Sequence, residues 1–389
     1  MDSKKEEKRK RLAVFLDGTW NAVGDNTNVW RLRSLCKSMS DDGRRQIIYY
    51  DIGVNGFIGG AFGKGLQRNI TDAYEWLIEN YAEGDEIFIF GFSRGAFTAR
   101  SLAGLIAKCG LIERGAPLGV GQLYDRYKRD DHSVYKIDEL IAKGELPTFT
   151  REQRWVHQFC RRAEVTMVGV WDTVGALGVP AFSIPGISRK TFGFLETGLR
   201  RPIKHGFHAI AIDENRRAFL PTLWTINTHE PDGSPTPYRR PIEQVEQRWF
   251  VGAHGNVGGG YADDPMPAAS LRWIMRRAAA LKLTFHREVE VEDLKGAKVA
   301  NSFAEFAGGA YSWLTSKHNR PIDEELPTNE HGRHANVNET IDGTVFDKWR
   351  TDSWYRPDNL KEWARRKKVD PADLSGPRLA VDPTKVVAD

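Results

Sequence analysis

One stretch of the sequence decides the fold: Glu86-Ile-Phe-Ile-Phe-Gly-Phe-Ser-Arg-Gly95, which continues into an apolar segment from Ala96 to Ala107. Residues 86–90 are a short apolar run, which predicts a buried strand. The Gly-x-Ser-x-Gly pentapeptide then predicts a sharp turn into a helix. A turn of this kind lifts a serine out of the sheet and exposes it to a base, so the stretch predicts that Ser93 is a nucleophile.

Apolar runs elsewhere extend this unit into a regular alternation of strands and helices. Further strands are expected at residues 12–17, 47–51, 165–171 and 247–253, and further helices at residues 69–81, 151–162 and 268–283. The glycine-rich residues 53–65 predict a loop. The alternation predicts an α/β fold of the α/β-hydrolase type, with a mostly parallel central sheet and helices on both faces.

The length of 389 residues, 40% of them hydrophobic, allows one large catalytic domain with additions. We expect a charged leader at residues 1–10, the catalytic domain at 11–290, a C-terminal decoration at 291–375 and a loose tail at 376–389. Within the catalytic domain, residues 175–207 mix Gly, Pro, Phe and Ile without a clear period. This composition predicts a cap or lid insertion that lies over the sheet.

Several polar residues directly follow predicted strands, namely Asp17, Ser93, Asp172 and His254. Because the carboxyl ends of parallel strands meet at one edge of a sheet, these side chains are expected to converge there. We predict that His254 is the base for Ser93 and that Asp172 orients the imidazole, in the chain order that this fold uses. Three other carboxylates remain alternatives for the acid: Asp213, Asp263 and Asp264.

The turn after the first strand, Asp17-Gly-Thr-Trp-Asn21, allows two interpretations. Asp-Gly-Thr also occurs in phosphatases with an aspartate nucleophile, whose motif is Asp-x-Asp-Gly-Thr. Here Phe15 stands at the position of that nucleophile, which excludes a phosphatase of this type. In a hydrolase the same turn can supply a backbone donor for the oxyanion, so we predict an oxyanion hole from the N–H groups of Gly18, Thr19 and Arg94.

Charge and composition exclude several other classes of protein. The net charge of +4 comes from 56 basic and 52 acidic residues, a mixed surface that does not indicate nucleic-acid binding. The three cysteines form no Cys-x-x-Cys pair, and His205 and His208 have no third ligand in a recognisable pattern. The segment Gly59–Gly65 lacks the last Ser or Thr of a phosphate-binding loop. No cofactor and no metal are therefore predicted.

The sequence also bears on location. Residues 1–11 form a charged run without an apolar core, and no stretch of about 18 apolar residues follows. We expect a cytoplasmic protein, or one exported by a route that needs no signal peptide. The predicted insertion interleaves apolar and basic side chains, which suits a lid over an acyl chain or peripheral contact with an anionic membrane. A packed cap with a solvated basic rim is the alternative.

Five blocks of sequence together resemble one known family. They are Phe15-Leu-Asp-Gly-Thr-Trp-Asn21, Gly91-Phe-Ser-Arg-Gly-Ala-Phe-Thr-Ala-Arg100, Val170-Trp-Asp-Thr-Val-Gly175, His208-Ala-Ile-Ala-Ile-Asp-Glu214 and Trp249-Phe-Val-Gly-Ala-His-Gly-Asn-Val-Gly-Gly-Gly-Tyr261. From residue 11 to about residue 275 the chain resembles the DUF2235 family of α/β-hydrolases, which includes the catalytic domain of type VI secretion phospholipase effectors. One departure is Asn256, where the family usually has aspartate in His-Ser-Asp-Val-Gly-Gly-Gly-Tyr.

The resemblance implies an α/β-hydrolase fold and hydrolysis of carboxylic esters, with Ser93 as nucleophile and His254 as base. By the same analogy the substrate is a phospholipid or another acyl ester, and the partners include a secretion apparatus or an immunity protein. Two alternatives stay open: a non-catalytic binding module with a hydrolase fold, and a soluble esterase or thioesterase with the same site and another substrate.

Overall fold

The structure is a computed structural model that describes residues 9–18, 26–53, 60–129, 131–145, 148–174, 199, 201–229, 240–305, 317–326, 333–376 and 378–379. Four features expected from the sequence lie wholly or mostly outside these residues. They are the charged leader (1–10), Thr19, most of the insertion at 175–207 and most of the tail at 376–389.

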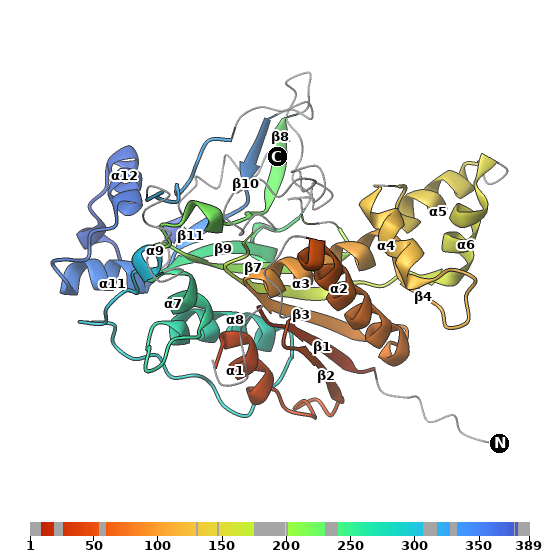
Figure 1. Ribbon diagram of the computed structural model, residues 1–389, viewed down its shortest axis with the longest axis horizontal. Coiled ribbons are helices and arrows are strands. Elements are labelled where there is room, and N and C mark those ends of the chain that lie inside the picture. The colour runs from red at the N-terminus through yellow and green to blue at the C-terminus, as the bar shows by residue number, and fades with distance from the viewer. Residues whose placement is uncertain are drawn as a thin grey trace.

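A twisted sheet lies at the centre of the described part of the chain (Figure 1). Its strands are β1 (Arg11–Leu16), β2 (Gln46–Asp51), β3 (Glu86–Phe92), β6 (Val165–Trp171), β7 (Ile203–Ala211), β9 (Val245–Phe250), β11 (Glu339–Ile341) and β12 (Arg378–Leu379). Their order across the sheet is β12-β11-β9-β7-β6-β3-β1-β2. All neighbours from β11 to β2 are parallel, and only the edge strand β12 is antiparallel to its neighbour. The predicted α/β fold with a mostly parallel sheet is therefore confirmed.

Helices cover both faces of this sheet. Helices α2 (Gly60–Asn80) and α3 (Arg94–Cys109) lie on one face, and α1 (Asn28–Leu35) and α8 (Pro267–Ala280) lie on the other (Figure 1). Strand β1 shows how the sequence produces this arrangement, because its side chains alternate between the faces. Leu12, Val14 and Leu16 pack with α2 and α3, whereas Ala13 and Phe15 pack with α1 and α8.

Two smaller units join the central layers. A helical excursion between α3 and β6 contains β4 (Leu111–Ile112), α4 (Val120–Lys128), α5 (Val134–Ala142), α6 (Arg151–Phe159) and β5 (Cys160–Arg161), and it stands at the right of Figure 1. Strands β4 and β5 pair with each other, so the excursion leaves and returns at one place. The other unit is the two-stranded sheet of β8 (Thr225–His229) and β10 (Arg333–Asn336).

The C-terminal part of the chain packs against the β11 end of the sheet. It contains α9 (Ser302–Glu305), α11 (Gly343–Thr351) and α12 (Asp358–Lys367). Apolar residues of α11 and α12, including Phe346 and Trp363, share a core with Trp249 of β9 and Ile341 of β11. The region at 291–375, predicted as decoration, is therefore continuous with the central sheet. The sequence does not reveal this strand, because β11 is only three residues long and two of them, Glu339 and Thr340, are polar.

Two predicted boundaries and one predicted turn differ from the structure. Strand β7 begins at Ile203, inside the predicted insertion, because Lys204, His205 and His208 interrupt the apolar run expected of a buried strand. Helix α2 begins at Gly60, inside the predicted loop, since burial of its later turns outweighs the low helix propensity of glycine. The glycine-rich turn after β9 contains the short helix α7 (His254–Gly258).

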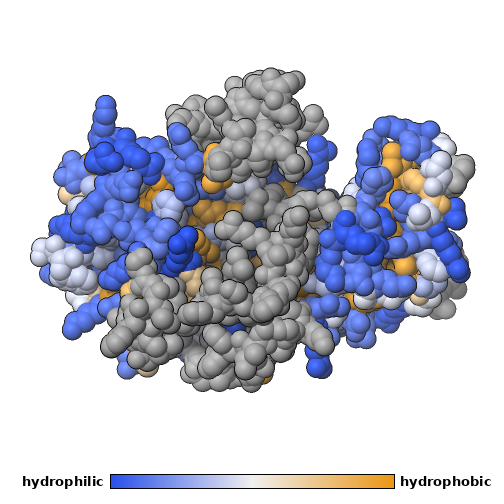
Figure 2. Space-filling view, turned by 45° about the horizontal axis from the view of Figure 1, so that its top comes forward, coloured by the Kyte–Doolittle hydropathy of each residue, from blue (hydrophilic) through white to orange (hydrophobic). Residues whose placement is uncertain are grey.

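The surface of the described residues is mixed. Most coloured residues in Figure 2 are hydrophilic, and hydrophobic residues come to the surface in small patches, some of them on the excursion at the right. Among the described helices, none is both long and apolar enough to cross a membrane.

Candidate active site

Ser93 lies at the turn between β3 and α3 and has an unusual backbone conformation. Its φ of 58° and ψ of −122° lie where residues other than glycine are rare and strained. The Ser93 N–H donates to the carbonyl oxygen of Trp171 at 3.0 Å, which fixes the turn to the end of β6. The turn therefore holds the serine at the carboxyl edge of the sheet, as the pentapeptide predicts.

The two glycines of the pentapeptide are required by close backbone contacts. A Cβ atom at Gly91 would lie 2.4 Å from the carbonyl oxygen of Gly95. A Cβ atom at Gly95 would lie 2.1 Å from the carbonyl oxygen of Leu16 and 2.6 Å from that of Asp17. Real Cβ atoms do not approach backbone atoms this closely, so helix α3 can start against β1 only because residue 95 has no side chain.

Gly95→Ala is expected to lower the free energy of unfolding by about 1–3 kcal/mol, because the added methyl group must push the helix away from β1. Urea unfolding at neutral pH measures the change. Gly121→Ala in α4 is the matched control, since a Cβ atom there would meet nothing within 4 Å. The control is expected to be neutral or to stabilise by up to about 1 kcal/mol. If the two variants behave alike, the close approach at Gly95 does not constrain the turn.

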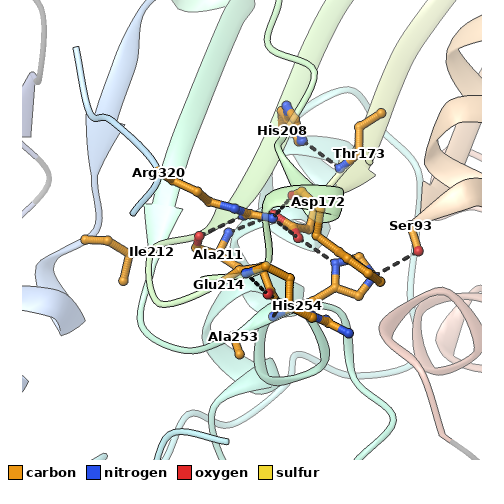
Figure 3. A network of polar contacts seen from close by, with 12 residues as sticks. Ser93, Asp172, Thr173, His208, Ala211, Ile212, Glu214, Ala253, His254 and Arg320 are labelled. Carbon is orange, nitrogen blue, oxygen red and sulfur yellow. Dashed lines mark hydrogen bonds and ion pairs between the residues drawn. The ribbon is translucent and has the colours of Figure 1, made fainter. Parts of the chain in front are cut away.

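The imidazole of His254 connects the serine to a carboxylate (Figure 3). Its Nε2 lies 2.8 Å from Ser93 Oγ, and its Nδ1 lies 2.5 Å from Asp172 Oδ2. The rings of Phe92 and Phe219 flank it, with centroids 4.7 Å and 5.1 Å away. Burial lowers the pKa of His254 below its ordinary value of 6.5, although Asp172 opposes the change. The imidazole is therefore neutral at pH 7 and can accept a proton through Nε2.

Asp172 directly follows β6 and is completely buried. Its Oδ1 accepts hydrogen bonds from the N–H of Ala211 at 3.0 Å and from Arg320 Nη1 at 2.6 Å. Its Oδ2 accepts from Arg320 Nη2 at 3.0 Å as well as from His254. Burial alone would raise the pKa of Asp172, but the charge of Arg320 and the hydrogen bonds from His254 and Arg320 outweigh it and hold the pKa far below its usual range. Asp172 is therefore ionised at neutral pH.

The loop that carries His254 is held by a second set of polar contacts. The backbone N–H of His254 donates to Glu214 Oε2 at 3.2 Å, and Glu214 also accepts from Nε and Nη2 of Arg216. Burial would raise the pKa of Glu214, but Arg216 lowers it to about 2. Asn256, at the family's usual aspartate position, accepts from the N–H groups of Ala253 and Ala300 and donates to Asp264. An amide can make these three bonds at once, because it both accepts and donates.

The other predicted candidates for the acid do not contact His254. The Asp213 carboxylate accepts from the N–H of Gly252 and from the hydroxyl of Tyr355, and burial raises its pKa to about 6. Asp264 accepts from Asn256 and from the N–H of Met266, and Asp263 is exposed. Of the four carboxylates that the sequence left open, Asp172 is the one beside the imidazole.

The predicted oxyanion hole is wrong at Gly18 and stays a prediction at Thr19 and Arg94. The N–H of Gly18 donates to the carboxylate of its own neighbour Asp17 at 2.9 Å, so the prediction that Gly18 supplies a free donor was wrong. Asp17 also accepts from Thr27 Oγ1 at 2.5 Å and from the Tyr50 hydroxyl at 3.2 Å, and it thus fixes the turn. Thr19 lies outside the described residues. Arg94 is the first residue of α3, where N–H groups point out of the start of a helix.

The two histidines with metal-like spacing have separate backbone partners. His208 is fully buried, its pKa is lowered to about 3 mainly by burial, and its Nε2 accepts from the N–H of Thr173 at 3.0 Å. Its neutral ring thus anchors the residue next to Asp172. His205 Nδ1 lies 2.9 Å from the carbonyl oxygen of Thr166. Within the described residues, no three His, Cys, Asp or Glu side chains are grouped closely enough to hold a metal ion.

The fold and the arrangement at its carboxyl edge define a class, the α/β proteins of hydrolase type. Within this class, the chain belongs to the family described as T6SS phospholipase effector Tle1-like, catalytic domain, whose model matches residues 10–277. The family resemblance of the five sequence blocks is thereby confirmed. Membership supports a hydrolase of the lipase or phospholipase type.

One curated protein and two solved structures are similar to parts of the chain. The uncharacterized protein YEL023C of Saccharomyces cerevisiae is 26% identical over 242 residues, which are 56% of this chain and 33% of the relative. The crystal structure of an uncharacterized protein from Pseudomonas aeruginosa has a TM-score of 0.46 and 15% identity, over 80% of this chain and 52% of that one. The structure of the Tle1 effector bound to the VgrG spike from the Type 6 secretion system has a TM-score of 0.33 and 18% identity, over 65% of this chain and 51% of that one. The chain thus spans about a third to a half of these relatives.

Proposed function

We propose that the protein hydrolyses carboxylic esters of phospholipids through an acyl-enzyme at Ser93. The observation that carries the proposal is the unbroken line of contacts from Ser93 Oγ to His254 and from His254 to the ionised Asp172. A serine hydroxyl becomes nucleophilic when a neutral base takes its proton during attack. His254 has the position and the protonation state for that role, and Asp172 stabilises the imidazolium that forms.

The reaction follows from these positions. Ser93 Oγ attacks the ester carbonyl carbon while its proton moves to His254 Nε2, and the carbonyl oxygen becomes an oxyanion. The N–H of Arg94 and the positive end of α3 stabilise that charge. The imidazolium then gives its proton to the leaving alcohol, which leaves an acyl group on Ser93. Water hydrolyses this ester with His254 again as base, and the free serine is restored.

A phospholipid is favoured as substrate by the family and by apolar side chains near the site. Leu220, which is 39% exposed, directly follows Phe219, whose ring packs on His254. Tyr261, which is 40% exposed, lies over Gly255 of α7, where an added Cβ atom would meet its ring. Exposed apolar groups beside a site suit an acyl chain or a membrane surface. Peripheral membrane contact and a secretion partner belong to the same proposal.

A fluorophosphonate probe and lipid analysis together test the proposal. The purified protein is expected to form one covalent adduct at Ser93, located by peptide mass spectrometry. Vesicles of phosphatidylethanolamine and phosphatidylglycerol should then yield free fatty acid and lysophospholipid, because an acyl ester is cleaved. The adduct and the lipid products should both disappear in Ser93→Ala.

The alternatives give different results in the same two measurements. A non-catalytic binding module would show neither labelling nor products, which would contradict the proposal. A soluble esterase or thioesterase would be labelled at Ser93 and would cleave short acyl esters or thioesters, but it would leave the vesicles intact. That result would retain the acyl-enzyme and reject the phospholipid.

A further inference from the structure

We propose that Arg320 is a positioning residue of this site: it holds Asp172 in alignment with His254 and sets the pH range in which His254 acts as a base. The proposal rests on the proposed function, since it assigns a role within the same reaction. Arg320 was not predicted from the sequence, and it lies beyond residues 10–277, which the family model matches.

The guanidinium of Arg320 is 1% exposed and binds four acceptors at once. Its Nη1 donates to Asp172 Oδ1 at 2.6 Å and to the carbonyl oxygen of Ala211 at 2.8 Å. Its Nη2 donates to Asp172 Oδ2 at 3.0 Å and to the carbonyl oxygen of Phe219. Two parallel bonds from a planar fork fix the plane of a carboxylate, which a single donor cannot do. Arg320 therefore determines the direction in which Oδ2 meets His254.

The same side chain also places the surroundings of the imidazole. Phe219, whose carbonyl oxygen binds Arg320, packs its ring edge against His254. The carbonyl oxygen of Arg320 in turn accepts from Asn359 Nδ2 at 3.1 Å, and that amide also donates to Ile212 at the end of β7. The C-terminal helix α12 thus contacts the segment that carries Arg320. Arg320 therefore connects the C-terminal part of the chain to the Asp172 carboxylate and to Phe219, which packs on His254.

Arg320 also acts through its positive charge, which balances the negative charge of Asp172. The charged groups around His254 are Asp172 and Glu214, each paired through two hydrogen bonds, with Arg320 and Arg216 respectively. Two negative charges beside a buried imidazole would favour its protonated form, and the two guanidinium groups cancel them. Burial lowers the pKa of His254 below 6.5, and the charge of Arg216 acts in the same direction against Asp172 and Glu214, so the imidazole is neutral at pH 7. Without Arg320, the charge of Asp172 would be uncompensated and His254 would hold a proton more tightly.

Two measurements on Arg320→Gln test this role. The first is an NMR titration of His254 in protein with isotope-labelled histidine, with the signal identified by its loss in His254→Gln. The second is the pH dependence of kcat/KM on a short acyl ester, whose acid limb reports the base of the free enzyme. We expect the pKa of His254 to rise by about 1 in both measurements. We also expect kcat/KM at its optimum to fall by about 10- to 100-fold, because the acid loses its alignment.

Arg320→Lys and Arg126→Gln are the control variants. Lysine keeps the charge but lacks the fork, so we expect the pKa of His254 to stay near the wild-type value while kcat/KM still falls. Arg126 is equally buried but lies in α4, where it binds His132 and faces Asp131 and Glu152, so Arg126→Gln should change neither quantity.

The proposal is overturned if folded Arg320→Gln titrates like the wild type, because Arg320 would then be only a structural brace. If Arg320→Gln does not fold, Arg320→Lys decides: unchanged kcat/KM overturns the positioning role, and a fall at constant pKa supports it. Failure of the proposed function is a separate result. In that case the wild type shows no turnover that depends on Ser93, while the NMR titration still measures the coupling between Arg320 and His254.

Discussion

Ser93→Ala is expected to lower the kcat of ester hydrolysis by about 10⁵- to 10⁶-fold. In the proposed reaction the Ser93 hydroxyl attacks the substrate carbonyl carbon, and His254 has no hydroxyl to activate once Ser93 is replaced. Any residual rate comes from oxyanion stabilisation and binding, which persist without the serine. Steady-state kinetics on a chromogenic acyl ester, with protein free of contaminating esterases, measures the loss. A decrease smaller than about 100-fold would mean that another residue is the nucleophile.

The same position allows a test that separates chemistry from folding. Ser93 places its hydroxyl against His254 by adopting a positive φ, a conformation that glycine adopts without strain. Ser93→Gly should therefore be as inactive as Ser93→Ala but more stable than it, by about 1 kcal/mol after the greater chain entropy of unfolded glycine is subtracted. Urea unfolding of both variants measures the difference. Equal stability would show that the turn is not strained at residue 93.

Asp172→Asn is expected to have the second large effect, on kcat and on stability together. The amide cannot balance the imidazolium and can hold the wrong tautomer of His254, so kcat should fall by about 10⁴-fold. The substitution also leaves the buried guanidinium of Arg320 without a negative partner, which should cost about 3–5 kcal/mol of unfolding free energy. Enzyme kinetics and urea unfolding at pH 7 measure the two losses.

The double variant Asp172→Asn/Arg320→Gln distinguishes the two causes. Removing both charges should restore part of the stability that Asp172→Asn loses, but none of the kcat. Because the folded-state pKa of Asp172 lies below that of the unfolded chain, its stabilising effect is present at neutral pH and is lost as the pH falls below about 4. The variants should therefore lose their stability difference from the wild type in acid. A double variant no more stable than Asp172→Asn would show that the pair is not coupled.

The positions of Ser93, Asp172 and His254 could be predicted because each follows an apolar run that ends at the same edge of a parallel sheet. This inference needs only local patterns and the geometry of the fold. The choice of Asp172 over Asp213 required the structure, since both carboxylates follow strands. What differs is their partners: Asp172 faces the imidazole, whereas Asp213 binds the backbone of Gly252.

The features that the sequence did not reveal depend on contacts between distant or polar residues. Arg320 lies in a segment without periodicity, and it meets Asp172 across 148 residues of chain. Strand β7 is central in the sheet, but its polar residues hide it from a search for apolar runs. The motif Asp17-Gly18 fits a turn that supplies an oxyanion donor. Nothing in the motif shows that the Asp17 carboxylate accepts the hydrogen bond from the Gly18 N–H.

The pairing of Asp172 with Arg320 has a consequence for protein synthesis. The ribosome makes the carboxylate 148 residues before the guanidinium that neutralises it, and the chain must leave the exit tunnel before the two can meet. A nascent chain can therefore assemble the early strands while its buried acid still lacks a counter-ion. The site is thus complete only after residue 320 has left the ribosome, and a polypeptide interrupted before it would carry Ser93 and Asp172 without the guanidinium that aligns the carboxylate.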